Sequence, residues 1–386
     1  MRACAPTHTH VHTSAAPCCM NPRPHKLCFV NKTTCSVYYI VPRNNPPDSL
    51  AHQRRAAHLS ALLSCTWTLA RRRVTARHSM AHEKRRVEVL GKTMAYVEVG
   101  EGDPIVFVHG NPTSSFMWRN VLPHCSGLGR LIAPDLIGFG DSDKLDRASG
   151  NDRYSVLEQY RYFAALMDAL GVGMVGTDEG PQQNVTLVCH SWGGVLATHW
   201  ANLHRDAVRG IVTMEAPLRP FTSWSSMPRP LAVVFWLIKT CLGYYLVVRK
   251  NIMIEKAIPD NVMRELTAEE HAEYRRPFRN DHPEGAEARR PLLSFARAVP
   301  IVGDRHSKDA VSMMNGAWEW LKTSQIPKLL LAGDPGSSLT QAEKDMLRAF
   351  PNFTEVPVQG KHLITEDSPE AVGEAITEWY RKHFMS

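Results

Sequence analysis

The stretch that decides the fold is VTLVCHSWGG at residues 185–194. Its first five residues are apolar or β-branched, which predicts a buried strand, and the residues from Trp192 onward predict a helix. Ser191 stands at the junction, with the small residues Cys189 and Gly193 two positions before and after it. This small-x-Ser-x-small pattern is typical of a nucleophile elbow, a sharp turn that presents a serine hydroxyl above a parallel sheet.

Short apolar strands alternate with helices on both sides of this turn. A β-hairpin at residues 86–90 and 93–99 comes first. Alternation of this kind predicts a mostly parallel sheet covered on both faces, and the elbow within it indicates an α/β-hydrolase fold. The expected strands are 105–108, 131–133, 185–189, 210–214, 328–331 and 353–356, and the expected helices are 154–170, 192–204, 308–322, 340–350 and 369–384.

Residues 217–306 interrupt the alternation and predict a mainly helical cap, inserted between core segments 81–216 and 307–386. Within this cap, LAVVFWLIKTCLGYYLVV at residues 231–248 carries one charge, on Lys239. We expect a buried or pocket-lining segment there, with a lipid-facing interfacial helix and a short membrane span as the alternatives. The candidates to line an apolar pocket are Phe221, Trp224 and Phe235.

Residues 1–80 differ from the rest of the chain in composition. Eleven Lys and Arg and one acid within the first 82 residues give a charge of +10, which leaves −3 on the remainder of a chain of net charge +7. A mildly acidic body gives no electrostatic reason to bind nucleic acid. The composition of residues 1–80, called the leader below, predicts a disordered segment. Its Arg-rich, acid-free part at residues 50–77 resembles a mitochondrial presequence, whereas a true start at Met80 predicts a cytoplasmic protein.

Cysteine and histidine are concentrated in the same leader. Only Cys125, Cys189 and Cys241 lie in the body, too scattered for a disulfide framework, which predicts a body that is intracellular or indifferent to redox conditions. The leader's cysteines and histidines lack the paired spacing of a zinc site. A GxxxxG within the unusually long Gly-rich loop at 171–183 lacks the Lys-Ser/Thr of a phosphate loop. We therefore expect no metal and no organic cofactor.

A serine hydroxyl is a poor nucleophile until a base takes its proton, and the base needs an orienting acid. His362, in the VQGKHLITEDS segment after a predicted strand, is the candidate base. Two acids fit the chain order, Glu215 in TMEAP and Asp334 in LAGDPG, and their positions leave the choice open. Backbone N–H groups expected to form an oxyanion hole belong to Asn111 and Trp192.

Six motifs mark the body: HGNPTSSFMWR at 109–119, DLIGFGDSD at 135–143, HSWG at 190–193, MEA at 214–216, RRP at 289–291 and EDSP at 366–369. Through these motifs, residues 84–384 resemble the haloalkane dehalogenases and the Renilla-type luciferases. The resemblance implies that Glu215 is the acid and Asp334 is secondary, and that the side chains of Asn111 and Trp192 bind halide. It also implies an aspartate where this chain has Ser191.

The serine changes the expected reaction. In the dehalogenase mechanism an aspartate attacks carbon and water then splits the resulting ester, whereas a serine would leave an ether with no carbonyl for water to attack. An acyl substrate avoids this, because acyl-serine is itself an ester. We therefore expect a monomeric serine hydrolase of carboxylic esters that binds a small apolar substrate. The alternatives are dehalogenase-like or coelenterazine-type luciferase-like activity, and a binding protein without turnover.

Overall fold

The computed structural model describes residues 82–173, 184–227 and 229–385. All of them lie in one compact unit, Ala76–Ser386. The predicted leader and residues 174–183 of the predicted Gly-rich loop lie outside the described residues.

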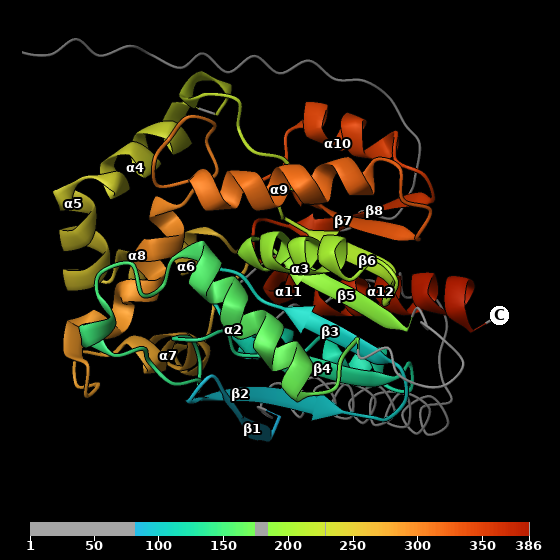
Figure 1. The fold of residues 1–386 in the computed structure, drawn as a ribbon, viewed down its shortest axis with the longest axis horizontal. Helices are drawn as coiled ribbons and strands as arrows, with labels where there is room; N and C mark the ends of the chain where they lie inside the picture. The colour runs from blue at the N-terminus through green and yellow to red at the C-terminus, as the bar shows by residue number, and fades with distance from the viewer. Residues whose placement is uncertain (1–81, 174–183, 228, 386) are drawn as a thin grey trace, which may run out of the picture. The chain divides into compact units, whose positions relative to one another are not determined.

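The described residues form an 8-stranded sheet in the order β1-β2-β4-β3-β5-β6-β7-β8 (Figure 1). The pairs β1–β2 and β2–β4 are antiparallel, and all the other neighbours are parallel. The predicted hairpin and the mostly parallel sheet are therefore confirmed. The strands are β1 (Lys84–Val89), β2 (Lys92–Val99), β3 (Pro104–Val108), β4 (Arg130–Pro134), β5 (Val185–His190), β6 (Val208–Met214), β7 (Lys328–Pro335) and β8 (Phe353–Gly360).

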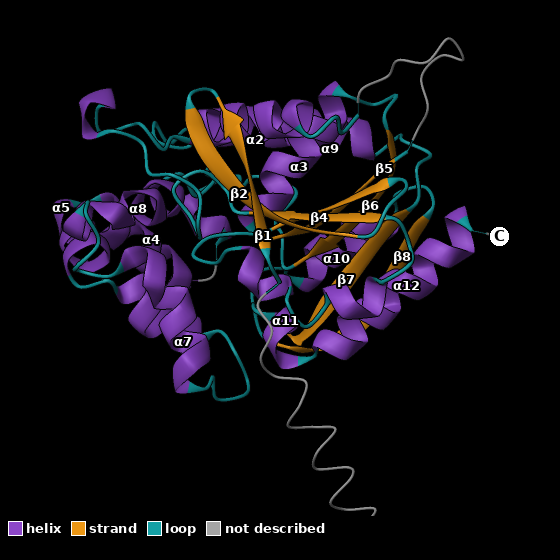
Figure 2. Cartoon of the chain, turned by 90° about the horizontal axis from the view of Figure 1, so that it is seen from below, coloured by secondary structure: helices purple, strands orange, loops and turns teal. Residues whose placement is uncertain are grey.

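Helices cover both faces of the sheet (Figure 2). On one face α2 (Val156–Ala169), α3 (Trp192–Leu203) and α9 (Lys308–Leu321) pack together, and α12 (Pro369–Phe384) lies on the other. Every residue of β3 and β5 is buried between them. A parallel strand covered on both faces must be apolar at successive positions, which explains the continuous apolar runs in the sequence. The helix between β7 and β8 is α10 (Gln341–Arg348).

Between β6 and α9 the described residues are mainly helical. The two ends of this cap meet, because the Phe221 N–H donates to the Pro300 carbonyl oxygen at 2.8 Å and the Val302 N–H to the Phe221 carbonyl oxygen at 2.9 Å. The cap therefore leaves and rejoins the core at one place. Its elements are α4 (Arg229–Lys239), α5 (Cys241–Tyr244), π-helical turns Tyr245–Arg249 and Met253–Ala257, α6 (Ile258–Asp260), α7 (Ala268–Arg275) and α8 (Arg290–Arg297).

A buried ion-pair network joins the cap to the core. Arg119, in the loop after β3, binds both carboxylate oxygens of Glu366 at 2.5 and 2.8 Å, and Glu270 of α7 at 2.7 Å. Arg264 of the cap binds the same two carboxylates at 2.5 to 2.9 Å. The Glu366 side chain is fully buried, so its charge depends on these two guanidinium groups and on the Tyr274 hydroxyl that donates to it.

Replacement of Arg119 by Met tests this network. We expect Arg119→Met to lower the free energy of unfolding by roughly 3–5 kcal/mol, because it leaves the two buried carboxylates with Arg264 as their one guanidinium partner. Urea denaturation at neutral pH measures the change. The matched control is Arg161→Met, which removes an exposed pair with Glu158 and should cost less than about 0.5 kcal/mol. Equal effects of the two substitutions would contradict the role of the network.

Candidate active site

Ser191 occupies the turn between β5 and α3 with φ 51° and ψ −123°. A residue other than glycine rarely adopts this backbone, so the surrounding contacts must hold it. Gly193 makes the turn possible, because a Cβ there would lie 2.2 Å from the Val108 carbonyl oxygen. A Cβ at Gly110 would lie 2.6 Å from the Ser191 Cβ. The elbow predicted from the sequence is therefore held by close contact between α3 and the loop after β3.

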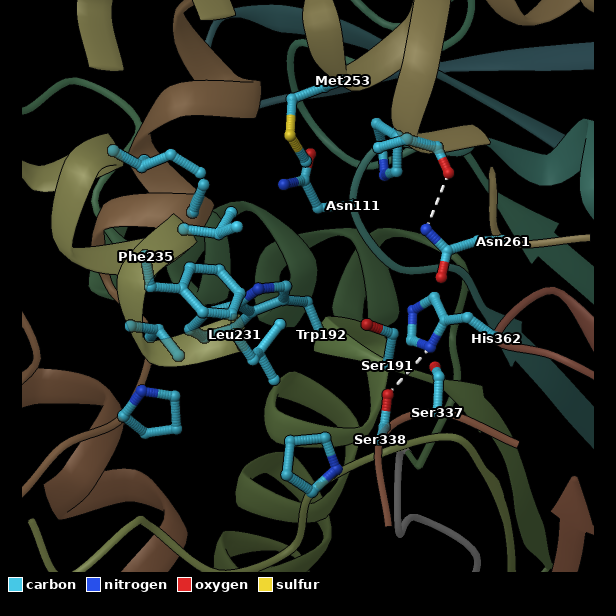
Figure 3. Close-up of a pocket in the computed structure, with 18 of the residues that line it drawn as sticks. Asn111, Ser191, Trp192, Leu231, Phe235, Met253, Asn261, Ser337, Ser338 and His362 are labelled. Carbon is cyan, nitrogen blue, oxygen red and sulfur yellow. Dashed lines mark hydrogen bonds between the residues drawn. The ribbon is translucent and has the colours of Figure 1, made fainter. Parts of the chain in front are cut away.

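His362 follows β8 and lines the same pocket as Ser191 (Figure 3). Burial, with a smaller contribution from the charge of His362, lowers the pKa of His190 to about 3. His190 is therefore neutral at pH 7, and its Nε2–H donates to the His362 carbonyl oxygen at 2.8 Å. The Asp367 carboxylate accepts the Lys361 N–H at 2.9 Å. These two bonds fix the loop that carries the candidate base.

The Ser191 hydroxyl points into the pocket rather than at the imidazole (Figure 3). Among the described residues no hydrogen bond joins Ser191 Oγ to His362. Catalytic hydrogen bonds are often open in enzymes without substrate and close when substrate binds. The candidate nucleophile and the candidate base therefore line the same pocket without a hydrogen bond between them.

Glu215, not Asp334, is the acid beside His362. Glu215 follows β6, is 1% exposed, and its Oε2 lies 3.6 Å from His362 Nδ1. Asp334 is an exposed residue of β7. The loop after β7 turns its backbone toward Glu215, since the N–H groups of Ser337 and Ser338 donate to Glu215 Oε2 at 2.9 and 2.8 Å. Of the two candidate acids, the structure brings together only Glu215 with the histidine.

The environment of Glu215 keeps it ionised. Burial by itself would raise the pKa of this carboxyl, but the neighbouring His362 imidazole and the N–H groups of Ser338 and Ser337 lower it to about 2. Glu215 is then a carboxylate at neutral and mildly acidic pH. A fixed negative charge at this position can stabilise an imidazolium formed on His362.

Ser338 is a candidate that the sequence reasoning missed. Its Oγ lies 2.8 Å from His362 Nδ1, closer than the Glu215 carboxylate. If His362 is to take a proton at Nε2, its Nδ1 must carry the hydrogen, and Ser338 Oγ is then the acceptor. Gly336-Ser337-Ser338 reads as an ordinary turn. The only sequence feature that pointed to Ser338 was its position just after a predicted strand, four residues beyond the candidate acid Asp334.

Asn111 follows β3 and Trp192 begins α3, and both face the pocket (Figure 3). Asn111 Nδ2 donates to the Leu292 carbonyl oxygen at 3.2 Å, while its Oδ1 is buried without a partner in the described residues. The Trp192 ring packs against Phe295 at a centroid distance of 4.9 Å. The first N–H groups of a helix have no intrahelical acceptor, so Trp192 can offer its N–H at the elbow.

The pocket has a volume of about 300 Å³ and mostly apolar walls. Of the three predicted aromatic residues, Phe221 and Phe235 line it, whereas Trp224 is not among its lining residues. Trp224 packs against the cap cluster Met227, Val299 and Ile301, as Phe221 and Phe235 also do, with Lys239 over its ring at 5.8 Å. The remaining cap residues on the wall are Pro217, Leu231, Val234, Ile238, Met253, Ala257, Ile258, Asn261, Ala296, Val299 and Pro300.

Metal binding and thiol chemistry depend on how His, Cys, Asp and Glu side chains are grouped and buried in the described residues. Within it, no group of three or more His, Cys, Asp or Glu side chains is arranged to hold a metal ion. Cys125, Cys189 and Cys241 are free thiols. Burial raises the pKa of Cys125 and of Cys189 to about 12, so neither is a reactive thiolate at neutral pH.

Comparison with known proteins identifies the group. The family model described as the alpha/beta hydrolase fold matches residues 103–236. A haloalkane dehalogenase from Sphingobium indicum is 44% identical over 300 residues, 78% of this chain and 96% of that protein. Another, from Mycolicibacterium smegmatis, is 46% identical over 298 residues, 76% of this chain and 90% of its own. The crystal structure of haloalkane dehalogenase DbeA from Bradyrhizobium elkani is 33% identical, with a TM-score of 0.69 over 78% of this chain and 98% of its own.

This chain belongs to the haloalkane dehalogenase family. It is a hydrolase with the α/β-hydrolase fold, as its sequence motifs predicted. In this family member the candidate side chains come from the ends of five parallel strands: Asn111 after β3, Ser191 after β5, Glu215 after β6, Ser338 after β7 and His362 after β8. The carboxyl ends of parallel strands meet at one edge of the sheet, which explains how residues so far apart in sequence share a pocket.

Replacement of Glu215 by Gln tests its depressed pKa. The folded-state pKa of about 2 lies below the ordinary value of 4.5, so the carboxylate stabilises the fold above pH 4.5, and this contribution is lost as the pH falls toward 2. We expect Glu215→Gln to lower the free energy of unfolding by about 3 kcal/mol at neutral pH and by progressively less below pH ~4.5.

Urea denaturation of both proteins between about pH 7 and pH 3 measures this difference. The matched control is Glu374→Gln, on an exposed position of α12, for which we expect no comparable pH dependence. A difference that stays constant across the whole pH range would refute the assignment for Glu215.

Proposed function

We propose that this chain hydrolyses carboxylic esters with an apolar acyl or alcohol part, through an acyl-serine at Ser191. The observation that carries the proposal is a hydroxyl at the elbow, on the same pocket wall as His362, with Glu215 3.6 Å behind the histidine. A hydroxyl in this setting is suited to attack on a carbonyl carbon, because the intermediate that it forms can be opened by water.

The roles follow from the positions. Ser191 Oγ attacks the ester carbonyl carbon as His362 Nε2 takes its proton, and Glu215 stabilises the imidazolium. The alcohol leaves with that proton, and water, activated by His362, then opens the acyl-serine. Backbone N–H groups of Asn111 and Trp192 bind the oxyanion, and one such donor contributes about 3–4 kcal/mol in the transition state.

The pocket limits the substrate class. A cavity of about 300 Å³ with mostly apolar walls, to which α4 contributes Leu231, Val234, Phe235 and Ile238, accepts a small, mainly apolar molecule. Its polar groups gather at one end, around Ser191, Asn111 and His362. An ester would place its carbonyl at that end and its hydrocarbon part against the cap.

Carbon–halogen hydrolysis is the second candidate, and the comparisons support it more directly than the first. The relatives named above are called haloalkane dehalogenases, and the resemblance assigns halide binding to Asn111 and Trp192, which both face the pocket. The difficulty is chemical. Attack of Ser191 Oγ on an alkyl carbon releases halide once and leaves an ether, so turnover would require a water molecule to act in place of the serine. No contact in the described residues favours a luciferase-like oxidation.

A chromogenic short-chain ester tests the first candidate. We expect sustained turnover by the full chain, and a loss of at least about 1000-fold in kcat in Ser191→Ala, because no nucleophile remains. The matched control is Ser225→Ala, an exposed serine of the cap, which should leave kcat and KM unchanged. Ester turnover that survives Ser191→Ala would rule out the acyl-serine route.

Halide release separates the two candidates. With a haloalkane, we expect the unchanged protein to release at most one halide for each Ser191 and to gain the mass of the alkyl group on that residue. Ser191→Asp supplies a carboxylate whose alkyl ester water can open, and it should release halide repeatedly. Multiple turnovers of haloalkane by the unchanged protein would establish the second candidate over the first.

A further inference from the structure

The helix α4 has two apolar faces with different surroundings. Leu231, Val234, Phe235 and Ile238, spaced i, i+3, i+4 and i+7, line the pocket. Val233 and Trp236 point the other way and are exposed, and Trp236 has 59% of its surface accessible. A large indole with this exposure is unusual on a helix whose other face already contributes to the core. The outer face of α4 is therefore a candidate binding surface.

The exposed apolar surface continues past the end of α4. Leu242 of α5 and Tyr245 of the following π-helical turn are also exposed. The segments Leu231–Lys239 and Cys241–Arg249 meet at an angle of 91°, at the edge of the cap far from the sheet (Figure 1). We call the exposed residues Val233, Trp236, Leu242 and Tyr245 the outer patch.

The shape of this segment suits a surface better than a membrane crossing. In the described residues no single helix is long and apolar enough to cross a bilayer, and only this bent pair is so when its two arms are combined. Lys239, at the bend, is held by Asp304 at 2.8 Å and by the Arg297 carbonyl oxygen at 2.5 Å. Val247 and Val248 are fully buried in the cap. Both arms are thus anchored in the protein, with one side left outward.

The charge around the outer patch is positive. From residue 216 to residue 254 the sequence contains no acid, while it contains five Lys and Arg. Of these, Arg229, Arg249 and Lys250 are exposed, before α4 and after the second arm. Two acids that reach this part of the cap from other elements are paired, Asp304 with Lys239 and Glu287 with Arg290. The segment itself therefore offers only positive charge to a partner.

We propose that the outer patch docks this protein on an anionic lipid bilayer. Exposed Trp and Tyr between apolar residues, with cations at the edges, match the chemistry of a bilayer interface, where indole and phenol rings sit at headgroup depth. Arg249 and Lys250 then face the anionic headgroups. Val234 lines the pocket and is 49% exposed, so the pocket wall reaches the surface beside the patch. An apolar substrate dissolved in the bilayer would meet the pocket at this point.

Sedimentation with lipid vesicles tests the proposal on the full chain. We expect the protein to bind vesicles of phosphatidylcholine with phosphatidylserine, and to bind less at high salt. The double substitution Val233→Ser/Trp236→Ser should weaken the binding roughly tenfold or more, because both side chains leave the interface. Arg249→Glu/Lys250→Glu should weaken binding to the anionic vesicles by a similar factor and have little effect with pure phosphatidylcholine.

The control variants carry the same types of substitution at exposed positions outside the outer patch. Leu157→Ser/Leu203→Ser removes two exposed apolar side chains, and Arg161→Glu/Lys382→Glu reverses two exposed charges; neither should change vesicle binding. The basic leader is present in every protein compared, so its contribution cancels. Thermal unfolding without lipid checks that the outer-patch variants keep the fold.

Hydrogen exchange locates the contact. Amides of residues 231–249 should exchange more slowly when vesicles are bound. Absence of binding, equal binding by the outer-patch variants and their controls, or unchanged exchange over residues 231–249 in the bound protein would each overturn the proposal. A concentration-dependent dimer that only Val233→Ser/Trp236→Ser dissociates, with no effect on vesicle binding, would assign the patch to a second copy of the chain instead.

Discussion

The site depends on the close approach of α3 to the backbone of β3 and the loop that follows it. Gly193 lies against the Val108 carbonyl oxygen and Gly110 lies against Ser191, at distances that no side chain would permit. This contact holds Ser191 at φ 51°, a conformation that costs free energy when isolated and persists here because both neighbours are fixed. The serine side chain and the N-terminus of α3 therefore share one small region with the start of the loop that carries Asn111. Other parts of the site are placed relative to that turn.

Electrostatics positions the histidine and the acid. The carboxylate of Glu215 is buried, yet it stays ionised because His362 and two backbone N–H groups stabilise it. Neutral His190 links the elbow strand to the His362 loop. Glu366, four residues after His362, is bound by the guanidinium groups of Arg119 in the core and Arg264 in the cap. The loop with the candidate base is thus held from the sheet on one side and from the cap on the other.

The elbow side chain sets the chemistry within a family whose fold is conserved in outline. An alkyl group on a carboxylate can be removed by water at the carbonyl, whereas an alkyl group on a hydroxyl cannot. The resemblance assigns halide binding to Asn111 and Trp192, which face the pocket, whereas the hydroxyl of Ser191 suits an acyl substrate. The family relationship therefore favours cleavage of a carbon–halogen bond, whereas the serine favours cleavage of an ester bond, in a substrate of similar size and polarity.

The sequence by itself determined the sheet, the elbow and the identity of the family, because these rest on local patterns: apolar runs of strand length, glycines at a tight turn, and short motifs around Ser191 and His362. The residue patterns alone left the choice of acid between Glu215 and Asp334 open, and the resemblance favoured Glu215. The tertiary structure shows that Glu215 is the carboxylate beside the His362 imidazole. The contact of Ser338 with the imidazole and the absence of Trp224 from the residues lining the pocket also appear only in the tertiary structure. Contacts between segments more than a hundred residues apart depend on how the strand ends and the cap pack, and no local pattern encodes that packing.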